Sequence, residues 1–186
     1  MAEPVAAVAH DPDRDAVYLA EHRLEALLER VGTAGGAVTS FGARFVLEPA
    51  LVFTTLVAAQ GFATLTCIEW GLRPVVVIHA SGVRHSSYRA ARGQRPPQIR
   101  LAEWGGTRLT LCHELAHHVV ESANGQPAVA VHGGEFRGAL TGLLEHVGAP
   151  EQARWLRLAH RDAGLVTPLR LPGVADQDQQ GSGKVT

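Results

Sequence analysis

The sequence feature that most constrains this chain is the pentapeptide His113-Glu114-Leu115-Ala116-His117, which lies inside an apolar stretch. Residues four apart on an α-helix return to within about 40° of the same direction, so both imidazoles project from one face and can share a metal ion. The neighbouring positions are apolar and suit a packed helix: Leu109, Leu111, Val119 and Val120. The pattern therefore predicts a helix over residues 108–122 that carries a metal site.

Glu114 gives this metal site a chemical use. It stands one step around the helix from His113, where its carboxylate can reach a water molecule on the metal. Zinc held by neutral imidazoles lowers the pKa of such a water to about 7. A neighbouring glutamate can accept the proton and later deliver it to a leaving amine. The motif therefore predicts metal-assisted hydrolysis of an amide bond, with Glu114 as general base and acid.

A catalytic zinc site needs a third protein ligand and one open position. Two candidates follow the helix, His132 and Glu135, and the spacing alone leaves both open. The extended metzincin pattern is excluded, because Val120 and Ala123 stand where it requires glycine and histidine. His118 points about 100° away from its neighbour, so we expect it to contact the sheet or an acceptor behind the ligands.

The pentapeptide followed by His132-Gly-Gly-Glu-Phe136 resembles the SprT-like zinc metallopeptidases, a zincin family marked by the helical motif and a later His-Gly-x-x-Phe element. The small size is similar to bacterial metallohydrolases of this group. The resemblance implies that His113, His117 and His132 bind Zn²⁺. It also implies that Glu114 is the catalytic carboxylate and that Glu135 has a supporting role. It also implies a peptide or protein substrate that pairs with residues 98–102, expected to form the edge strand.

One departure from the family concerns nucleic acid. Many relatives carry a cysteine-rich zinc ribbon after the catalytic domain, but this chain has no cysteine after Cys112. DNA as a partner is then supported only by an arginine cluster between residues 84 and 108, in which Glu103 is the single acid. The cluster comprises Arg84, Arg89, Arg92, Arg95, Arg100 and Arg108. We expect a solvated basic edge, with contact to nucleic acid as the alternative.

Two further residues are candidates for substrate contact. Tyr88 lies on a predicted strand that could border the cleft, where its hydroxyl would donate a hydrogen bond in the transition state. Arg100 lies on the next strand and could touch substrate. For both residues the alternative is a packing or surface role.

The elements expected along the chain indicate an α+β, zincin-like fold, with a small mixed or antiparallel sheet packed against the metal helix and further helices on the other side. Helices are expected over residues 11–31, 50–59, 108–122, 135–147 and 150–161, the first opened by a cap at Asp11-Pro12-Asp13. Strands are expected over residues 44–47, 74–79, 86–90 and 98–102, with 74–79 buried on both faces and 33–40 a flexible link. Residues 1–172 are expected to form a single domain, followed by a disordered polar tail over 173–186.

The composition favours a cytoplasmic protein. The formal net charge is −1, there are two cysteines, and no secretory signal is recognisable at the N-terminus. Residues 49–68 carry no charge, and we expect a buried element rather than a membrane span, because polar residues interrupt the stretch and acids flank it. The sequence leaves the oligomeric state open. It also leaves two other functions open, a zinc-stabilised binding or scaffold protein without turnover and a DNA-associated factor.

Overall fold

The computed structural model describes residues 11–102, 106–124 and 131–168, and within them the chain is a mixed α+β protein. The α-helices are α1 Arg14–Val31, α2 Leu56–Glu69, α3 Arg108–Asn124, α4 Gly134–His146 and α5 Pro150–Asp162. The strands are β1 Gly36–Ser40, β2 Ala43–Leu47, β3 Val76–His79, β4 Ser87–Arg89 and β5 Gln98–Leu101, and a short 3₁₀ turn, Gly32–Ala34, follows α1.

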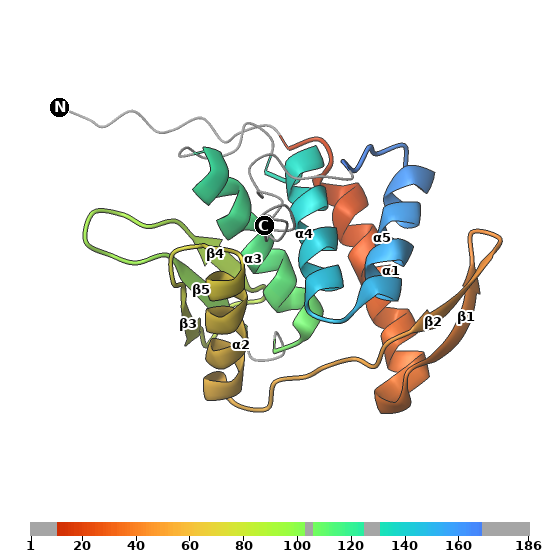
Figure 1. Ribbon diagram of the computed structural model, residues 1–186, viewed down its shortest axis with the longest axis horizontal. Helices are drawn as coiled ribbons and strands as arrows, with labels where there is room; N and C mark the ends of the chain where they lie inside the picture. The colour runs from red at the N-terminus through yellow and green to blue at the C-terminus, as the bar shows by residue number, and fades with distance from the viewer. Residues whose placement is uncertain (1–10, 103–105, 125–130, 169–186) are drawn as a thin grey trace, which may run out of the picture.

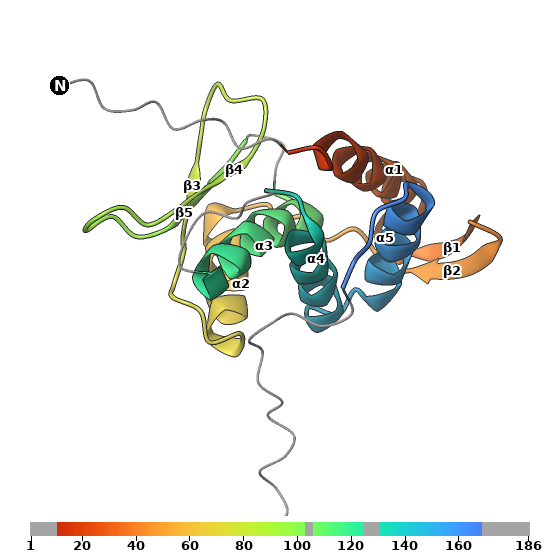
Figure 2. The same cartoon turned by 90° about the horizontal axis from the view of Figure 1, so that it is seen from above.

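Helix α3 occupies the middle of the molecule (Figures 1 and 2). The sheet of β3, β4 and β5 lies on one side of it together with α2, and α4 lies on the other. Helices α5 and α1 follow α4, and the β1–β2 hairpin forms the far end. One apolar cluster joins these elements, with members such as Leu24 of α1, Phe45 of β2, Leu115 of α3, Leu140 of α4 and Leu156 of α5.

The helix expected over residues 108–122 is α3, and its start has the expected cap. The Thr107 hydroxyl accepts a hydrogen bond from the Thr110 backbone N–H at 3.1 Å, which satisfies one of the free donors of the first turn. Arg108, the first residue of the helix, is buried, and its guanidinium donates to the Pro49 carbonyl at 2.9 Å. Arg108 therefore does not belong to an exposed basic surface, and the arginine cluster expected from the sequence loses this member.

The three-stranded sheet is mixed, with the order β3-β5-β4. Strand β5 pairs with β3 in parallel and with β4 antiparallel, so the expectation that residues 98–102 form an edge strand is wrong. Its alternation arises because one face, carrying Ile99 and Leu101, is buried. The expectation that residues 74–79 are buried on both faces is also wrong, since β3 is the edge strand and Val76 is 37% exposed.

The two edges of this sheet differ in how open they are. Along β3, the Gln60 side-chain amide from α2 donates to the Val75 carbonyl at 2.9 Å and accepts from the Val77 N–H at 2.8 Å. Gln60 thus takes the place of a neighbouring strand and closes this edge. The other edge is β4, which lies against α3.

Helix α2 differs from the helix expected over residues 50–59. It begins at Leu56, where the Thr55 hydroxyl accepts from the Ala58 N–H at 3.2 Å. The preceding residues are extended instead and bond to the start of α3, through Phe53 N–H to the Gly106 carbonyl at 2.6 Å. The expectation of a buried element over 49–68 is wrong for one face, since Val57 is 82% exposed. No helix in the described residues is both long and apolar enough to cross a bilayer.

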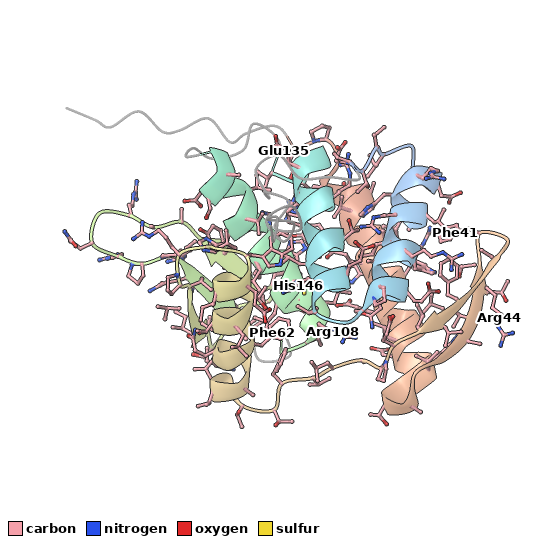
Figure 3. All side chains as sticks on the ribbon, viewed as in Figure 1. Phe41, Arg44, Phe62, Arg108, Glu135 and His146 are labelled. Carbon is pink, nitrogen blue, oxygen red and sulfur yellow. The ribbon has the colours of Figure 1, made fainter. Side chains whose placement is uncertain are left out.

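The link expected over residues 33–40 is in fact part of a β-hairpin. Strand β1 pairs antiparallel with β2 through a two-residue turn at Phe41 and Gly42, which have φ values of 51° and 70°. Two-residue hairpin turns of this kind need positive φ at both positions and usually carry Asn or Gly. Phe41 takes the unusual conformation beside α5 (Figure 3), where its ring lies 5.3 Å from that of Trp155.

Candidate metal centre

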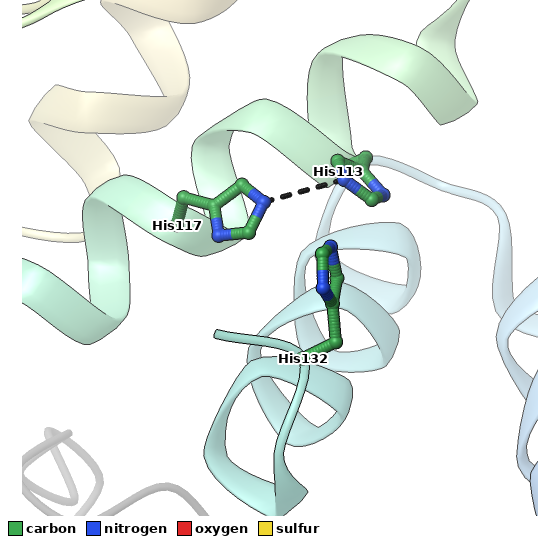
Figure 4. A group of neighbouring side chains, drawn as sticks. All are labelled: His113, His117 and His132. Carbon is green, nitrogen blue, oxygen red and sulfur yellow. Dashed lines mark hydrogen bonds between the residues drawn. The ribbon is translucent and has the colours of Figure 1, made fainter. Parts of the chain in front are cut away.

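Three imidazoles from two separate segments meet beside the middle of α3 (Figure 4). His113 and His117 come from successive turns of α3, and His132 comes from the turn before α4. One nitrogen from each lies within 4.8 Å of the other two, and within the described residues this is the one group of that kind. The ring centroids are 5.0 to 5.3 Å apart, so the rings form a nearly regular triangle.

The nitrogen positions fit a tetrahedral metal ion. The Nε2 atoms of His113 and His117 are 3.3 Å apart. Two nitrogens that each lie 2.0–2.1 Å from a tetrahedral ion are separated by about 3.3–3.4 Å. The Nε2 atom of His132 is buried and has no hydrogen-bond partner within the described residues. A metal ion shared by the three rings would satisfy this atom, which would otherwise be a costly buried polar group.

Two carboxylates, one from α1 and one from the residues just before it, lie behind two of the three rings. Both oxygens of Glu21 lie 2.9 Å from Nδ1 of His113, and an Asp11 oxygen lies 2.5 Å from Nδ1 of His132. Carboxylates in these positions accept a hydrogen bond from Nδ1–H and leave the lone pair on Nε2, which fixes the tautomer needed for metal binding. Both carboxylates are largely buried.

The first turn of α1 also holds the segment that carries His132. The Asp13 carboxylate accepts from the buried Arg137 guanidinium at 2.6 Å, and Arg137 in turn donates to the His132 carbonyl at 2.8 Å. The expected cap at Asp11-Pro12-Asp13 is therefore wrong in its detail. Asp13 stands at the N-cap position without capping the helix through its side chain, because its carboxylate is bound to Arg137.

Phe136 packs against all three imidazoles. Its ring centroid lies 4.9 Å from His113, 4.5 Å from His117 and 4.8 Å from His132, and the side chain is buried. The aromatic residue of the His-Gly-x-x-Phe element thus forms an apolar base for the triangle. An apolar base excludes water from one side of the rings and limits how far they can rotate.

The electrostatics of the three imidazoles differ from ring to ring. Burial, together with the neighbouring His113 and His132, lowers the pKa of His117 well below its usual value. Burial also lowers the pKa of His132, although the Asp11 carboxylate opposes this. Burial acts in the same direction on His113, but the Glu21 carboxylate outweighs it and raises the pKa of that ring. His117 and His132 are therefore neutral at physiological pH, as metal ligands must be.

Glu114 is buried next to the imidazoles and has an unusual proton affinity. Burial, together with the nearby Glu21 carboxylate, raises the pKa of Glu114 to about 7. The positive charge of His113 and a hydrogen bond from the Tyr88 backbone N–H act in the opposite direction. A carboxylate with a pKa near neutrality can both accept and return a proton.

Two cavities open on either side of the site, with volumes of about 490 and 450 Å³. The first extends along α1 toward Glu25, and the second extends past His117 and His132 toward Val131. Six residues line both, two each from α1, from the start of β4 and from α3: Arg14, Tyr18, Ser86, Ser87, His113 and Glu114. The cavities therefore form one cleft that runs between α1 and β4 and passes over His113 and Glu114.

The other residues singled out from the sequence lie around this cleft in different ways. Glu135 is exposed in the first turn of α4 (Figure 3) and lies outside the group of three histidines. Tyr88 lines the second cavity, but its hydroxyl lies 2.9 Å from Nδ1 of His118. Nε2 of His118 lies 2.8 Å from the Arg73 carbonyl, so His118 contacts the sheet side rather than the metal group. Arg100 lies on the central strand β5 and is not among the described residues that line the two cavities.

The sequence reasoning missed the contribution of α1. Asp11, Arg14, Tyr18 and Glu21 all reach the site, and the ring of Tyr18 lies 5.4 Å from that of His113 at an angle of 26°. One signal was present in the sequence. Glu21 falls on the buried face of the helix, between the apolar residues Val17, Leu24 and Leu28, where a charged side chain needs a partner.

Comparison of the chain with protein-family models, curated proteins and solved structures gave no match, so its function has to be argued from the site.

Proposed function

We propose that this chain is a zinc-dependent metallohydrolase with a zincin-like fold, similar to the SprT-like metallopeptidases, and that it hydrolyses peptide bonds. The observation that carries the proposal is the triangle of His113, His117 and His132 beside the buried Glu114. Three imidazoles are a typical ligand set for catalytic zinc; binding of the metal displaces any proton on the ligating nitrogens and leaves a fourth position open. When bound, zinc would polarise a carbonyl group and lower the pKa of a coordinated water to about 7.

Glu114 has the properties required of the proton carrier in this reaction. As water adds to the amide carbon, its proton passes to the Glu114 carboxylate and the carbonyl π electrons move onto the oxygen. When the carbon–nitrogen bond breaks, the same proton passes to the leaving amine. Burial raises the proton affinity of the carboxyl group, which favours the first of these transfers.

The cleft suits an extended peptide that pairs with β4. This strand is the edge of the sheet nearest α3, and the backbone N–H of Tyr88 reaches Glu114 from it. The opposite edge is closed by Gln60, so β4 is the edge left for strand addition. A peptide lying between β4 and α1 would present its carbonyl groups to His113 and Glu114.

Metal analysis and a cleavage assay test the proposal together. We expect the purified wild-type protein to contain one zinc ion per chain and to cleave fluorescently labelled casein. Glu114→Gln should keep the zinc and lose at least about 100-fold in rate, because the proton carrier is gone. Glu145→Gln, an exposed acid of α4, is the matched control and should behave as wild type.

The zinc ligand set is tested separately with His132→Ala. This variant should lose zinc under conditions in which Glu114→Gln retains it. Zinc retained in full by His132→Ala would contradict the ligand set. A wild-type protein that holds zinc but cleaves no protein substrate would contradict the hydrolase and favour a zinc-stabilised binding protein.

A further inference from the structure

The two cavities of the cleft meet at a wall formed by Arg14 and Tyr18 of α1. These two residues lie one helical turn apart and face Ser86 and Ser87 across the cleft. Any chain that occupies both cavities has to pass between these walls, directly over His113 and Glu114. Arg14 and Tyr18 are therefore next to the point where the bond would be cleaved.

The Tyr18 ring is held in a defined position over the imidazoles. It is stacked on His113, with ring centroids 5.4 Å apart, and it lies 5.2 Å from the ring of His132 at an angle of 57°. The side chain is half-buried, so one side of the phenol packs while the other borders the cavities. A phenol with an ordinary pKa near 10 keeps its proton at neutral pH and can donate a hydrogen bond.

Arg14 gives this hydroxyl a positive neighbour. Its guanidinium lies 5.5 Å from the centre of the Tyr18 ring and acts on the hydroxyl as a nearby charge and hydrogen-bond donor, although burial and the Glu21 and Glu114 carboxylates outweigh it and raise the pKa of Tyr18. Among the residues that the structure describes, Arg14 is the one arginine or lysine that lines either cavity, and the cleft is otherwise rich in acids, such as Asp15, Glu21 and Glu25. A single cation at the junction of an acidic cleft suits a site where negative charge develops during a reaction.

Tyr88, the other tyrosine in the cleft, already donates its hydroxyl hydrogen bond to His118. Nε2 of His118 donates to the Arg73 carbonyl, so Nδ1 of His118 has to accept the proton of the Tyr88 hydroxyl. Tyr88 therefore has no proton left to donate to a substrate. Of the two tyrosines in the chain, Tyr18 is the one that remains for the role that the sequence suggested for Tyr88.

We propose that Tyr18 is a catalytic residue whose hydroxyl, polarised by Arg14, donates a hydrogen bond to the carbonyl oxygen of the scissile amide. The bond strengthens as water adds to the carbon and the π electrons move onto that oxygen. No proton leaves Tyr18, and the negative charge disappears again when the carbon–nitrogen bond breaks. The inference rests on the proposed hydrolase function and adds to it the group that stabilises the transition state.

Kinetics of Tyr18→Phe give the first test. The variant keeps the ring that stacks on His113 and loses only the hydroxyl. We expect kcat on labelled casein to fall by roughly 100-fold, with KM and zinc content nearly unchanged, because the missing bond forms mainly in the transition state. Arg14→Gln should show a smaller fall in kcat. The matched control is Arg23→Gln, an exposed arginine of α1 that lines neither cavity.

Ligand binding gives a second test that needs no turnover. The zinc-loaded protein is titrated by calorimetry with an N-phosphoryl dipeptide, which carries tetrahedral anionic oxygens, and with a mercaptoacyl dipeptide, which ligates zinc through sulfur. Tyr18→Phe should weaken the phosphoryl ligand at least about 10-fold and leave the mercaptoacyl ligand unchanged. Equal losses for both ligands, no loss for either, or a selective loss in Tyr88→Phe instead would overturn the proposal.

The two proposals fail in different ways. If zinc-loaded wild type cleaves no protein substrate, the hydrolase proposal fails, whereas the selective loss of the phosphoryl ligand in Tyr18→Phe is still measured. If wild type cleaves casein and Tyr18→Phe cleaves it equally well, the role of Tyr18 fails and the hydrolase stands.

Discussion

Glu21 shows how much one side chain contributes to the candidate site. Its carboxylate accepts a hydrogen bond from Nδ1–H of His113 at 2.9 Å, and the side chain is buried. A carboxylate behind a ligand imidazole raises the basicity of the other nitrogen and fixes the ring. In the proposed zinc site Glu21 is therefore a positioning residue, which would act on the metal through His113.

Replacing Glu21 by glutamine should weaken zinc binding without removing it. The amide can still accept a hydrogen bond from His113, but the negative charge is lost, and we expect zinc affinity to fall about 10- to 100-fold. Competition with a chelating dye measures the affinity. Glu29→Gln, an exposed acid two turns further along α1 that lines neither cavity of the cleft, should bind zinc as wild type does. Unaltered affinity in Glu21→Gln would show that the carboxylate is only structural.

At this scale the sequence predicted the residues that share a local pattern. His113, Glu114 and His117 follow from spacing within one segment of the chain, and His132 follows from the resemblance to the SprT-like motif. Glu21 and His113 are 92 positions apart, and Asp11 and His132 are 121 apart. No local pattern records such pairs, because they arise only when α1 packs beside α3 and α4. The choice of His132 rather than Glu135 likewise depends on where the turn before α4 lies.

A buried histidine of helix α5 makes the stability of the fold depend on pH. His160 is fully buried, and burial together with the positive charge of Arg137 lowers its pKa to about 4, with Glu21 opposing. The pKa in the unfolded chain is about 6.5. As pH falls below 6.5 the unfolded state takes up a proton first, so the folded state loses stability down to pH 4 and no further below it.

The pH dependence is tested by comparing wild type with His160→Leu. Between pH 7.5 and 4.5 we expect the wild-type free energy of unfolding to fall by about 2–3 kcal/mol more than that of the variant. Urea denaturation at several pH values measures the difference. His22→Leu removes an exposed histidine of α1 and should keep the wild-type slope. Parallel slopes for wild type and His160→Leu would contradict a neutral His160 in the folded state.

Elements with strong helical periodicity and clear ends were predicted well. The helices expected over 135–147 and 150–161 are α4 and α5, which differ by a residue at most at each end. Errors fell where a local rule was broken. Phe41 occupies a turn position that usually takes Asn or Gly, so the hairpin was missed. Strand β5 was wrongly predicted to be an edge strand. The alternation of its apolar and polar residues shows that one face is buried, but it does not show how many strands pair with it.

For the whole molecule, the metal site joins the layers that the sequence alone could not place relative to one another. The three candidate ligands come from α3 and the turn before α4, and the carboxylates behind them come from α1 and the residues just before it. Asp11 and Asp13 tie the first turn of α1 to His132 and Arg137. Zinc binding should therefore stabilise the contacts among α1, α3 and α4. The loss of zinc should destabilise the beginning of α1 first.

Removal of zinc by a chelator tests this coupling. A ligand present at about 1,000 times its dissociation constant adds roughly 4 kcal/mol to stability, so chelation should lower the melting temperature by about 10 °C. Hydrogen exchange should accelerate most in residues 11–18, while the middle of α5, which touches no ligand, stays protected. His132→Ala should already melt at the lower temperature and respond little to the chelator. If chelation strips the zinc and the melting temperature and the exchange at α1 do not change, the three histidines do not couple these helices through a metal ion.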